Sequence, residues 1–302
     1  MLSKTRPVDS WTLYQNPYTM IKQFYFFLLG AAIVILSSCG TQPSNENTID
    51  EETLITEMSI VGEEVSYKSD SVTMKGYIAF DETDTTLRPG ILVVHEWWGH
   101  TDYVRERAEM LAELGFVALA VDMYGDGKQA EHPDNAKKFS GMVMQNMDGA
   151  EVRFTEAIEV LKNHPQTADE NISAIGYCFG GSLILAMANK GVDLDGVAAF
   201  HSGVQLPVAP NNNLQARVLV QNGADDPFVS PESVADFKAA MDSLQKPYKY
   251  ENYPGAVHAY TNPGADSLGK KFDLPLAYNA EADMKSWERM KEFFKELYPN
   301  MN

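Results

Sequence analysis

Along most of this chain, short apolar runs alternate with segments in which apolar residues recur at helical spacing. Residues 64–68 and 72–80 alternate or run apolar on either side of a polar turn at 69–71, which predicts a β-hairpin or meander. Further strands are expected at 91–95, 116–121, 172–175, 197–200, 216–220 and 248–253. Helices are expected at 103–114, in two patterns within 134–162, and at 183–189, 234–244 and 284–297.

The order of these elements indicates the fold class. Strands and helices alternate, and most of the strands are apolar throughout rather than at every second residue. Strands of that kind are typical of parallel sheets that helices cover on both faces. We therefore expect an α/β protein with a mostly parallel central sheet, built as one domain over residues 58–302.

The N-terminal region has a different pattern. Residues 24–36 form an apolar run after Lys22, which is too short for a comfortable membrane span but suits the core of a signal peptide. The run ends in Leu36-Ser37-Ser38-Cys39-Gly40, a string that resembles the lipobox of bacterial lipoproteins. An uncleaved hydrophobic anchor is the alternative interpretation of this run.

The lipobox resemblance implies that residues 1–38 are removed and that Cys39 becomes a lipidated N-terminus. Met20 offers a second start, which would give a compact signal peptide without residues 1–19. Residues 39–57 are polar, acidic and poor in large apolar groups, so we expect a flexible tether between lipid and domain. The expected location is the bacterial cell envelope, on its periplasmic side or at the outer membrane.

Charge and cysteine content narrow the possible partners. The formal net charge of -18, without any long basic run, argues against a nucleic-acid partner. Cys39 and Cys178 are the two cysteines of the chain, one in the apolar leader and one in a glycine-rich turn. Because each has a separate explanation, we do not expect a disulfide. The sequence does not indicate an oligomeric state.

Gly176-Tyr177-Cys178-Phe179-Gly180-Gly181 follows a predicted strand and opens a predicted helix. A nucleophile elbow needs this strand–turn–helix setting, with glycines two residues before and after the nucleophile. The helix N-terminus would favour a Cys178 thiolate, and the Phe179 N–H would be placed to bind an oxyanion. The alternative is a small, inert core cysteine.

An elbow of this kind predicts an acid and then a histidine, each just after a later strand. Asp225 and Asp226 follow the strand at 216–220, and His258 follows the strand at 248–253. The order of nucleophile, acid and base is therefore met. Either aspartate could be the acid, although a turn aspartate before proline and a surface histidine are also common.

At these motifs the chain resembles the dienelactone hydrolase family, over about residues 62–300. The shared motifs are His95 to Gly99, Asp122 to Gly125, Gly176 to Gly181, Asp225 to Val229 and Gly255 to Tyr260. The resemblance implies an α/β-hydrolase fold and a triad of Cys178, Asp226 and His258, which favours Asp226 over Asp225 as the acid.

The resemblance also assigns roles around the triad. Glu96 matches a glutamate that contacts the thiol and helps to control its ionisation, and Trp97 would supply the second oxyanion N–H. Trp97 and Trp98 would wall the pocket, which Tyr124 and Tyr260 could also line. Where the family's lactone hydrolase has an arginine that pairs with a substrate carboxylate, this chain has Asn262, so a dicarboxylate substrate of that type is not expected.

No metal or other cofactor is expected. His95 and His100 superficially suggest a zinc motif, but they are five residues apart and begin at a strand end. The zinc motif needs two histidines four residues apart on one helix face.

The expected function is hydrolysis of a small carboxylic ester or lactone through a thioester acyl-enzyme. Acyl transfer, or cleavage of a thioester or amide, is possible on the same fold. The alternative outside the enzymes is a lipoprotein that keeps this fold as a non-catalytic binding module.

Overall fold

The computed structural model describes residues 57–69 and 71–301. The predicted signal peptide 1–38 with its alternative start at Met20, the lipidated Cys39 and all but the last residue of the 39–57 tether lie outside the described residues. Within the part of the chain that is described, no helix is long and apolar enough to cross a membrane. Every described element falls within one unit, Ile55–Asn302.

The described strands form one eight-stranded sheet in the order β1-β2-β4-β3-β5-β6-β7-β8. β1 and β2 form an antiparallel hairpin, β2 pairs antiparallel with β4, and the other neighbours are parallel. The strands are β1 Ile60–Ser69, β2 Val72–Asp81, β3 Arg88–Val94, β4 Val117–Val121, β5 Thr167–Tyr177, β6 Gly196–Phe200, β7 Arg217–Gly223 and β8 Tyr248–Tyr253. The prediction of a hairpin followed by a mostly parallel sheet is therefore confirmed.

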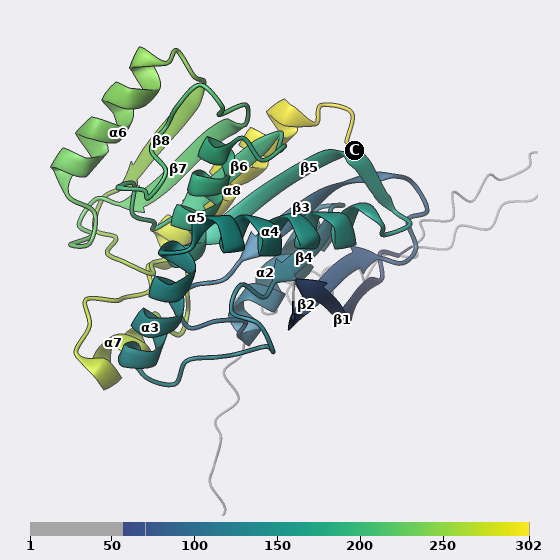
Figure 1. Ribbon diagram of the computed structural model, residues 1–302, viewed down its shortest axis with the longest axis horizontal. Coiled ribbons are helices and arrows are strands. Elements are labelled where there is room, and N and C mark those ends of the chain that lie inside the picture. The colour runs from purple at the N-terminus through teal and green to yellow at the C-terminus, as the bar shows by residue number, and fades with distance from the viewer. Residues whose placement is uncertain (1–56, 70, 302) are drawn as a thin grey trace, which may run out of the picture. The chain divides into compact units, whose positions relative to one another are not determined.

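Helices cover both faces of this sheet (Figure 1). The core on one face includes residues of α4, α5 and α6, and the core on the other includes residues of α2 and α8. The helices are α2 Asp102–Ala112, α3 Pro133–Met144, α4 Met147–Lys162, α5 Phe179–Lys190, α6 Pro231–Ser243, α7 Ala265–Phe272 and α8 Ala280–Leu297. This arrangement is the α/β-hydrolase fold that the sequence predicts.

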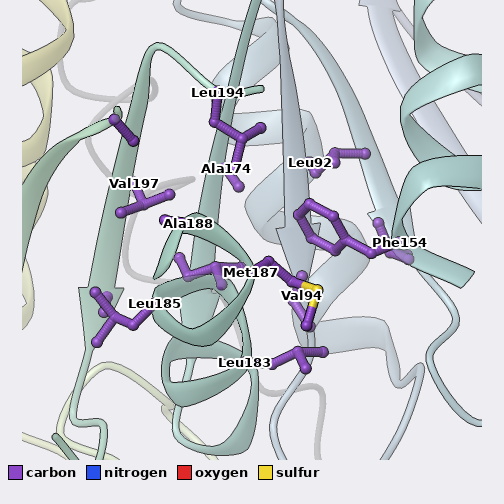
Figure 2. Close-up of a cluster of buried hydrophobic side chains, with 14 of the residues drawn as sticks. Leu92, Val94, Phe154, Ala174, Leu183, Leu185, Met187, Ala188, Leu194 and Val197 are labelled. Atoms are coloured by element: carbon purple, nitrogen blue, oxygen red, sulfur yellow. The ribbon is translucent and has the colours of Figure 1, made fainter. Parts of the chain in front are cut away.

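The central strands are apolar throughout because each of their faces packs against helices. Leu92 and Val94 of β3 belong to the cluster that also contains Phe154 of α4 (Figure 2). Ile91 and Val93, which alternate with them, belong to the cluster on the opposite face. Since successive strand side chains point to opposite faces, a strand that is buried on both sides loses the alternating pattern.

Of two further helical regions, one agrees with the sequence pattern and one does not. The patterns within 134–162 are two separate helices, because Asn146 caps α4 and accepts a hydrogen bond from the Gly149 N–H at 3.1 Å. The pattern does not predict α7, in which only Ala265 and Gly269 of its eight residues are buried. A helix with so few buried positions leaves little apolar periodicity in the sequence.

The sheet topology concentrates polar side chains at one edge. The chain leaves β3 toward β4 on one side and reaches β5 on the other, so the strand order reverses at β3. In open α/β sheets, ligands bind beyond the carboxyl ends of the strands at such a switch point. Glu96 follows β3 and Cys178 follows β5 at this place, while Asp226 and His258 follow β7 and β8.

Candidate active site

Cys178 occupies the turn between β5 and α5. Its backbone has φ 54° and ψ -114°, which is the strained conformation of a nucleophile elbow. The Cys178 N–H donates to the Phe200 carbonyl at 2.9 Å, which ties the turn to the neighbouring strand β6. α5 begins at the next residue, Phe179, so the sulfur lies at the positive end of this helix.

The glycines around Cys178 are needed because backbone segments approach one another closely. A Cβ at Gly176 would lie 2.4 Å from the carbonyl oxygen of Gly180, and a Cβ at Gly180 would lie 2.3 Å from that of Val94. Both positions therefore exclude any side chain. This geometry supports the sequence-based interpretation of the turn as an elbow rather than as a cysteine packed by chance.

The three predicted triad residues form a continuous row of hydrogen bonds. Nε2 of His258 lies 3.1 Å from the Cys178 sulfur, and Nδ1 of His258 lies 2.8 Å from Oδ2 of Asp226. The other oxygen of Asp226 accepts from the Phe228 N–H at 2.8 Å, which fixes the carboxylate. The rival acid, Asp225, instead accepts from the Gly255 N–H at 2.9 Å.

The charge of His258 follows from its two neighbours. Burial alone would lower the pKa of this imidazole, but the Cys178 sulfur and the Asp226 carboxylate both favour the protonated ring and together raise its pKa above the ordinary value. The site therefore favours a protonated His258 beside the Cys178 sulfur.

The peptide bond between Glu96 and Trp97 is oriented by a buried histidine. Burial lowers the pKa of His95 to about 4, so its ring is neutral. Nε2 of His95 accepts from the Met123 N–H at 3.2 Å, which leaves Nδ1 to donate to the Glu96 carbonyl at 2.6 Å. In a trans peptide, the Trp97 N–H then points away from His95. This second predicted oxyanion donor is thus held in a fixed direction.

Tyr124 also contacts the segment that contains Trp97. Its hydroxyl donates to the Trp97 carbonyl at 2.9 Å, and its ring lies 5.6 Å from the ring of Phe179. The tyrosine thus contacts both residues whose N–H groups are expected to bind the oxyanion. It lines a separate cavity of about 480 Å³, with α3 on one side, rather than the cavity that contains Cys178.

Glu96 is 4% exposed, and its described hydrogen-bond partner is Asn262 rather than the thiol. Nδ2 of Asn262 donates to Oε2 of Glu96 at 2.6 Å. Burial raises the pKa of Glu96 to about 7, although Asn262, His258 and Arg107 each act in the opposite direction. The predicted contact between Glu96 and Cys178 stays a prediction.

The cavity that contains Cys178 and His258, the candidate catalytic cavity, has a volume of about 340 Å³. Its lining includes Trp97, which the resemblance places in the pocket wall, together with Phe179 and one face of α3. The described lining residues are Trp97, Lys137, Ser140, Gly141, Met144, Cys178, Phe179, Ser182, Gly203 and His258.

The other predicted pocket residues lie elsewhere. Trp98 and Asn262 line a neighbouring cavity of about 450 Å³ together with Glu96. Tyr260 is fully buried and donates to the Gln221 carbonyl at 3.2 Å, and its ring packs against the rings of His201 and Tyr253 at 5.5 Å and 5.6 Å.

The loop after β8, which carries His258, is held by hydrogen bonds to residues that the sequence pattern does not single out. The Thr261 hydroxyl lies 2.8 Å from Nε2 of His201 and 2.6 Å from the Tyr103 hydroxyl. Arg107 donates to the Thr261 carbonyl at 2.5 Å and to Asp283 at 2.7 Å. His201 directly follows the buried strand β6, and a polar residue at that place is the one sequence signal that points to this network.

His201 lies next to His258 without sharing its charge. The two rings are 5.3 Å apart in an edge-to-face arrangement. Burial, together with the charges of His258 and Arg107, lowers the pKa of His201 well below its ordinary value. The neutral ring can therefore pack against a protonated His258 without repulsion.

The histidines that superficially suggest zinc have other partners. His95 contacts the backbone of Glu96 and Met123, and Nε2 of His100 lies 3.1 Å from the Ala120 carbonyl. Among the described residues, no group of three or more His, Cys, Asp or Glu side chains is arranged to hold a metal ion.

Comparison with known proteins finds relatives over most of the chain. The sequence model of the dienelactone hydrolase family matches residues 74–298. "Protein usf" of Aquifex pyrophilus is 30% identical over 241 residues, which cover 78% of this chain and 99% of that protein. Among solved structures, a dienelactone hydrolase-like promiscuous phosphotriesterase from metagenomic libraries is 32% identical, with a TM-score of 0.73 over 79% of this chain and 98% of that one. Another, m3DLH, is 30% identical, with a TM-score of 0.75 over the same shares.

Proposed function

Because the chain belongs to the dienelactone hydrolase family and is a hydrolase of that kind, we propose that it cleaves a carboxylic ester or lactone through a thioester on Cys178. The row of Cys178, His258 and Asp226, joined at 3.1 Å and 2.8 Å, carries this proposal. A nucleophile, a base and an acid that orients the base are within hydrogen-bond distance of one another, as covalent acyl chemistry requires.

The first half of the reaction forms the thioester. The Cys178 thiolate attacks the substrate carbonyl, and the Phe179 and Trp97 N–H groups stabilise the negative oxygen of the tetrahedral intermediate. The intermediate collapses with cleavage of the C–O bond of the ester. His258, protonated beside the thiolate, gives its proton to the leaving alkoxide. An open-chain ester gives a free alcohol and the acyl-enzyme. A lactone gives only the acyl-enzyme, because its alcohol part remains attached to the acyl chain on Cys178.

The second half regenerates the enzyme. His258 is now neutral and takes a proton from a water molecule, whose oxygen attacks the thioester carbonyl. The tetrahedral intermediate expels the Cys178 thiolate and releases the carboxylic acid. Asp226 keeps Nδ1 of His258 protonated in both halves, so that Nε2 always faces the reacting atoms.

Turnover of a panel of aryl esters and lactones tests this function on the full-length protein in mild detergent. We expect turnover that is lost in Cys178→Ala and is weak at most in Cys178→Ser. Unchanged turnover in Cys178→Ala would exclude the mechanism. If the wild type turns over none of the panel, alkylation of the thiol distinguishes the remaining possibilities. A reactive thiol would indicate another acyl substrate, such as a thioester or amide, and an inert thiol would indicate a binding module.

We also propose that the enzyme is anchored by lipid on Cys39 in the bacterial cell envelope. The support is the apolar run at 24–36 and the cleavage string that ends in Cys39. Incorporation of a labelled fatty acid into the wild type but not into Cys39→Ala is the expected result. Equal labelling of both proteins, or an uncleaved N-terminus, would contradict the anchor.

A further inference from the structure

One face of α3 forms a wall of the catalytic cavity. Lys137, Ser140, Gly141 and Met144 all line the cavity that contains Cys178 and His258. Their spacing of three and four residues places them on a single helix face. The next face of the helix, with Phe139, lines the separate cavity of about 480 Å³. α3 therefore stands between two cavities and buries only Ala136 and Val143.

Gly141 is unexplained by the fold. It lies inside α3, where glycine is the least favourable residue after proline. Its backbone does not need a glycine, since its φ is not positive. A Cβ there would meet only Nε2 of Gln145, at an ordinary contact distance of 3.9 Å. This situation contrasts with Gly176 and Gly180, where backbone atoms exclude a side chain.

The space in front of Gly141 belongs to the catalytic cavity. The large apolar side chains around this cavity are those of Trp97, Met144 and Phe179. Apart from His258 and the thiol, Lys137 is the one ionisable group in the described lining. An occupant of this space would therefore gain most from an apolar group, which these side chains would remove from water.

We propose that Gly141 is a specificity-determining residue, and that the missing side chain leaves room for an apolar substrate chain longer than acetyl. This inference rests on the proposed ester hydrolysis. It names the substrate class as esters with an extended apolar acyl or alcohol part. Gly141→Ala would remove the space of one methyl group, and Gly141→Leu would fill it with a branched side chain.

Two ester series test the inference. The first holds the p-nitrophenyl group constant and extends the acyl part from acetyl to hexanoyl, and the second extends the alcohol part of acetate esters. In one of them, we expect Gly141→Leu to lower kcat/KM for the longest member by roughly tenfold or more. The shortest member should change less than threefold, and Gly141→Ala should give a smaller effect in the same direction.

A matched variant separates this effect from helix stability. Asn135 is an exposed residue of α3 that lines neither cavity, so Asn135→Ala improves helix propensity without touching the substrate. Both Gly141→Ala and Asn135→Ala should raise Tm, and only the former should change the preference for chain length. If Gly141→Ala loses activity selectively on long esters while its Tm increases, the loss of activity cannot come from unfolding.

The outcomes distinguish this inference from the proposed function. Wild-type turnover with a chain-length preference that Gly141→Leu abolishes supports both. If the wild type turns over the esters, and each Gly141 variant changes kcat/KM for short and long esters by the same factor in both series, Gly141 does not determine specificity. The proposed ester hydrolysis would then still stand. Absence of wild-type turnover on every ester overturns the proposed ester hydrolysis and the inference with it.

Discussion

Asn262 donates a hydrogen bond to the carboxyl group of Glu96 across 2.6 Å, and both side chains are buried. The oxygen of the same amide accepts from the Gly264 N–H at 2.8 Å, which fixes which end of Asn262 faces Glu96. At the position where the family's lactone hydrolase has an arginine, this chain therefore holds its buried glutamate with a neutral donor. A neutral donor leaves the pKa of Glu96 raised, to about 7.

The raised pKa of Glu96 makes folding stability depend on pH near neutrality. Its native pKa of about 7 exceeds the ordinary value of 4.5, so the native state holds the proton more tightly than the unfolded state. The resulting stabilisation is complete below pH 4.5 and is lost as pH rises through 7. Glu96→Gln, which is neutral at every pH, should therefore be more stable than the wild type by a few kcal/mol at pH 8, and about equal at pH 4. Urea unfolding at both values measures the difference.

Asn262→Leu provides the matched variant for this prediction. Loss of the hydrogen bond should raise the pKa of Glu96 further, so the decline in stability should move to higher pH. The same substitution in the Glu96→Gln background should not move any transition in this pH range. A stability profile with the same midpoint in Asn262→Leu and in the wild type would show that the hydrogen bond does not control Glu96.

Replacement of the two neighbouring aspartates should have very different effects. Asp226→Asn removes the charge that orients and supports His258, and we expect kcat to fall by roughly 10²–10⁴-fold. Asp225→Asn loses an acceptor for the Gly255 N–H at the surface and should keep kcat within about threefold. Steady-state kinetics of both variants decides the assignment, which would be reversed if Asp225→Asn were the more damaging substitution.

Thr261 should act as a positioning residue for His258, which lies three residues before it in the same loop. Thr261→Val keeps the shape of the side chain but removes the hydroxyl shared by His201 and Tyr103, which destabilises the protein by about 1–3 kcal/mol. We expect kcat to fall on the order of tenfold with KM unchanged, because His258 loses its fixed direction. Thr261→Ser should restore both properties, and a Thr261→Ser variant as slow as Thr261→Val would rule out the hydroxyl.

The buried ion pair of Arg107 and Asp283 should be essential for stability. Arg107 is surrounded by the rings of Tyr103, Tyr177 and Trp287, at 5.3 to 5.6 Å from its central carbon. Arg107→Met would leave a carboxylate buried without its cation, at a cost of about 3–5 kcal/mol. The double variant with Asp283→Leu should recover part of this loss in thermal unfolding. Additive losses in the double variant would show that the two charges are not coupled.

The sequence predicts the nucleophile turn well because its signals are local. Gly176, Cys178 and Gly180 stand at every second position, and a Cβ at Gly176 would meet Gly180 of the same turn. The contact that excludes a Cβ at Gly180 instead comes from Val94 of β3. The order of Cys178, Asp226 and His258 along the chain follows from the topology of parallel strands. The strand pattern therefore points to Cys178 and His258 and leaves Asp225 and Asp226 open as the acid, and the family resemblance favours Asp226.

The parts that the sequence does not predict depend on contacts between distant residues. Thr261 and Tyr103 are 158 residues apart, and Asn262 and Glu96 are 166 residues apart. No local sequence pattern reveals such pairs. A threonine or asparagine a few residues after a histidine gives the same sequence signal whether it binds substrate or holds the loop that carries the histidine. α7 is absent from the predicted elements for a related reason, since it has too few buried positions to show a helical period.

Acylation of Cys178 by a slowly hydrolysed aryl ester tests the central claim most directly. Rapid mixing of the full-length protein with the ester should give a burst of aryl alcohol equal to the enzyme concentration. Mass spectrometry of the quenched protein should find the acyl group on the peptide that contains Cys178, and Cys178→Ala should show neither signal. An acyl group on another residue, or a full burst in Cys178→Ala, would contradict the thioester mechanism.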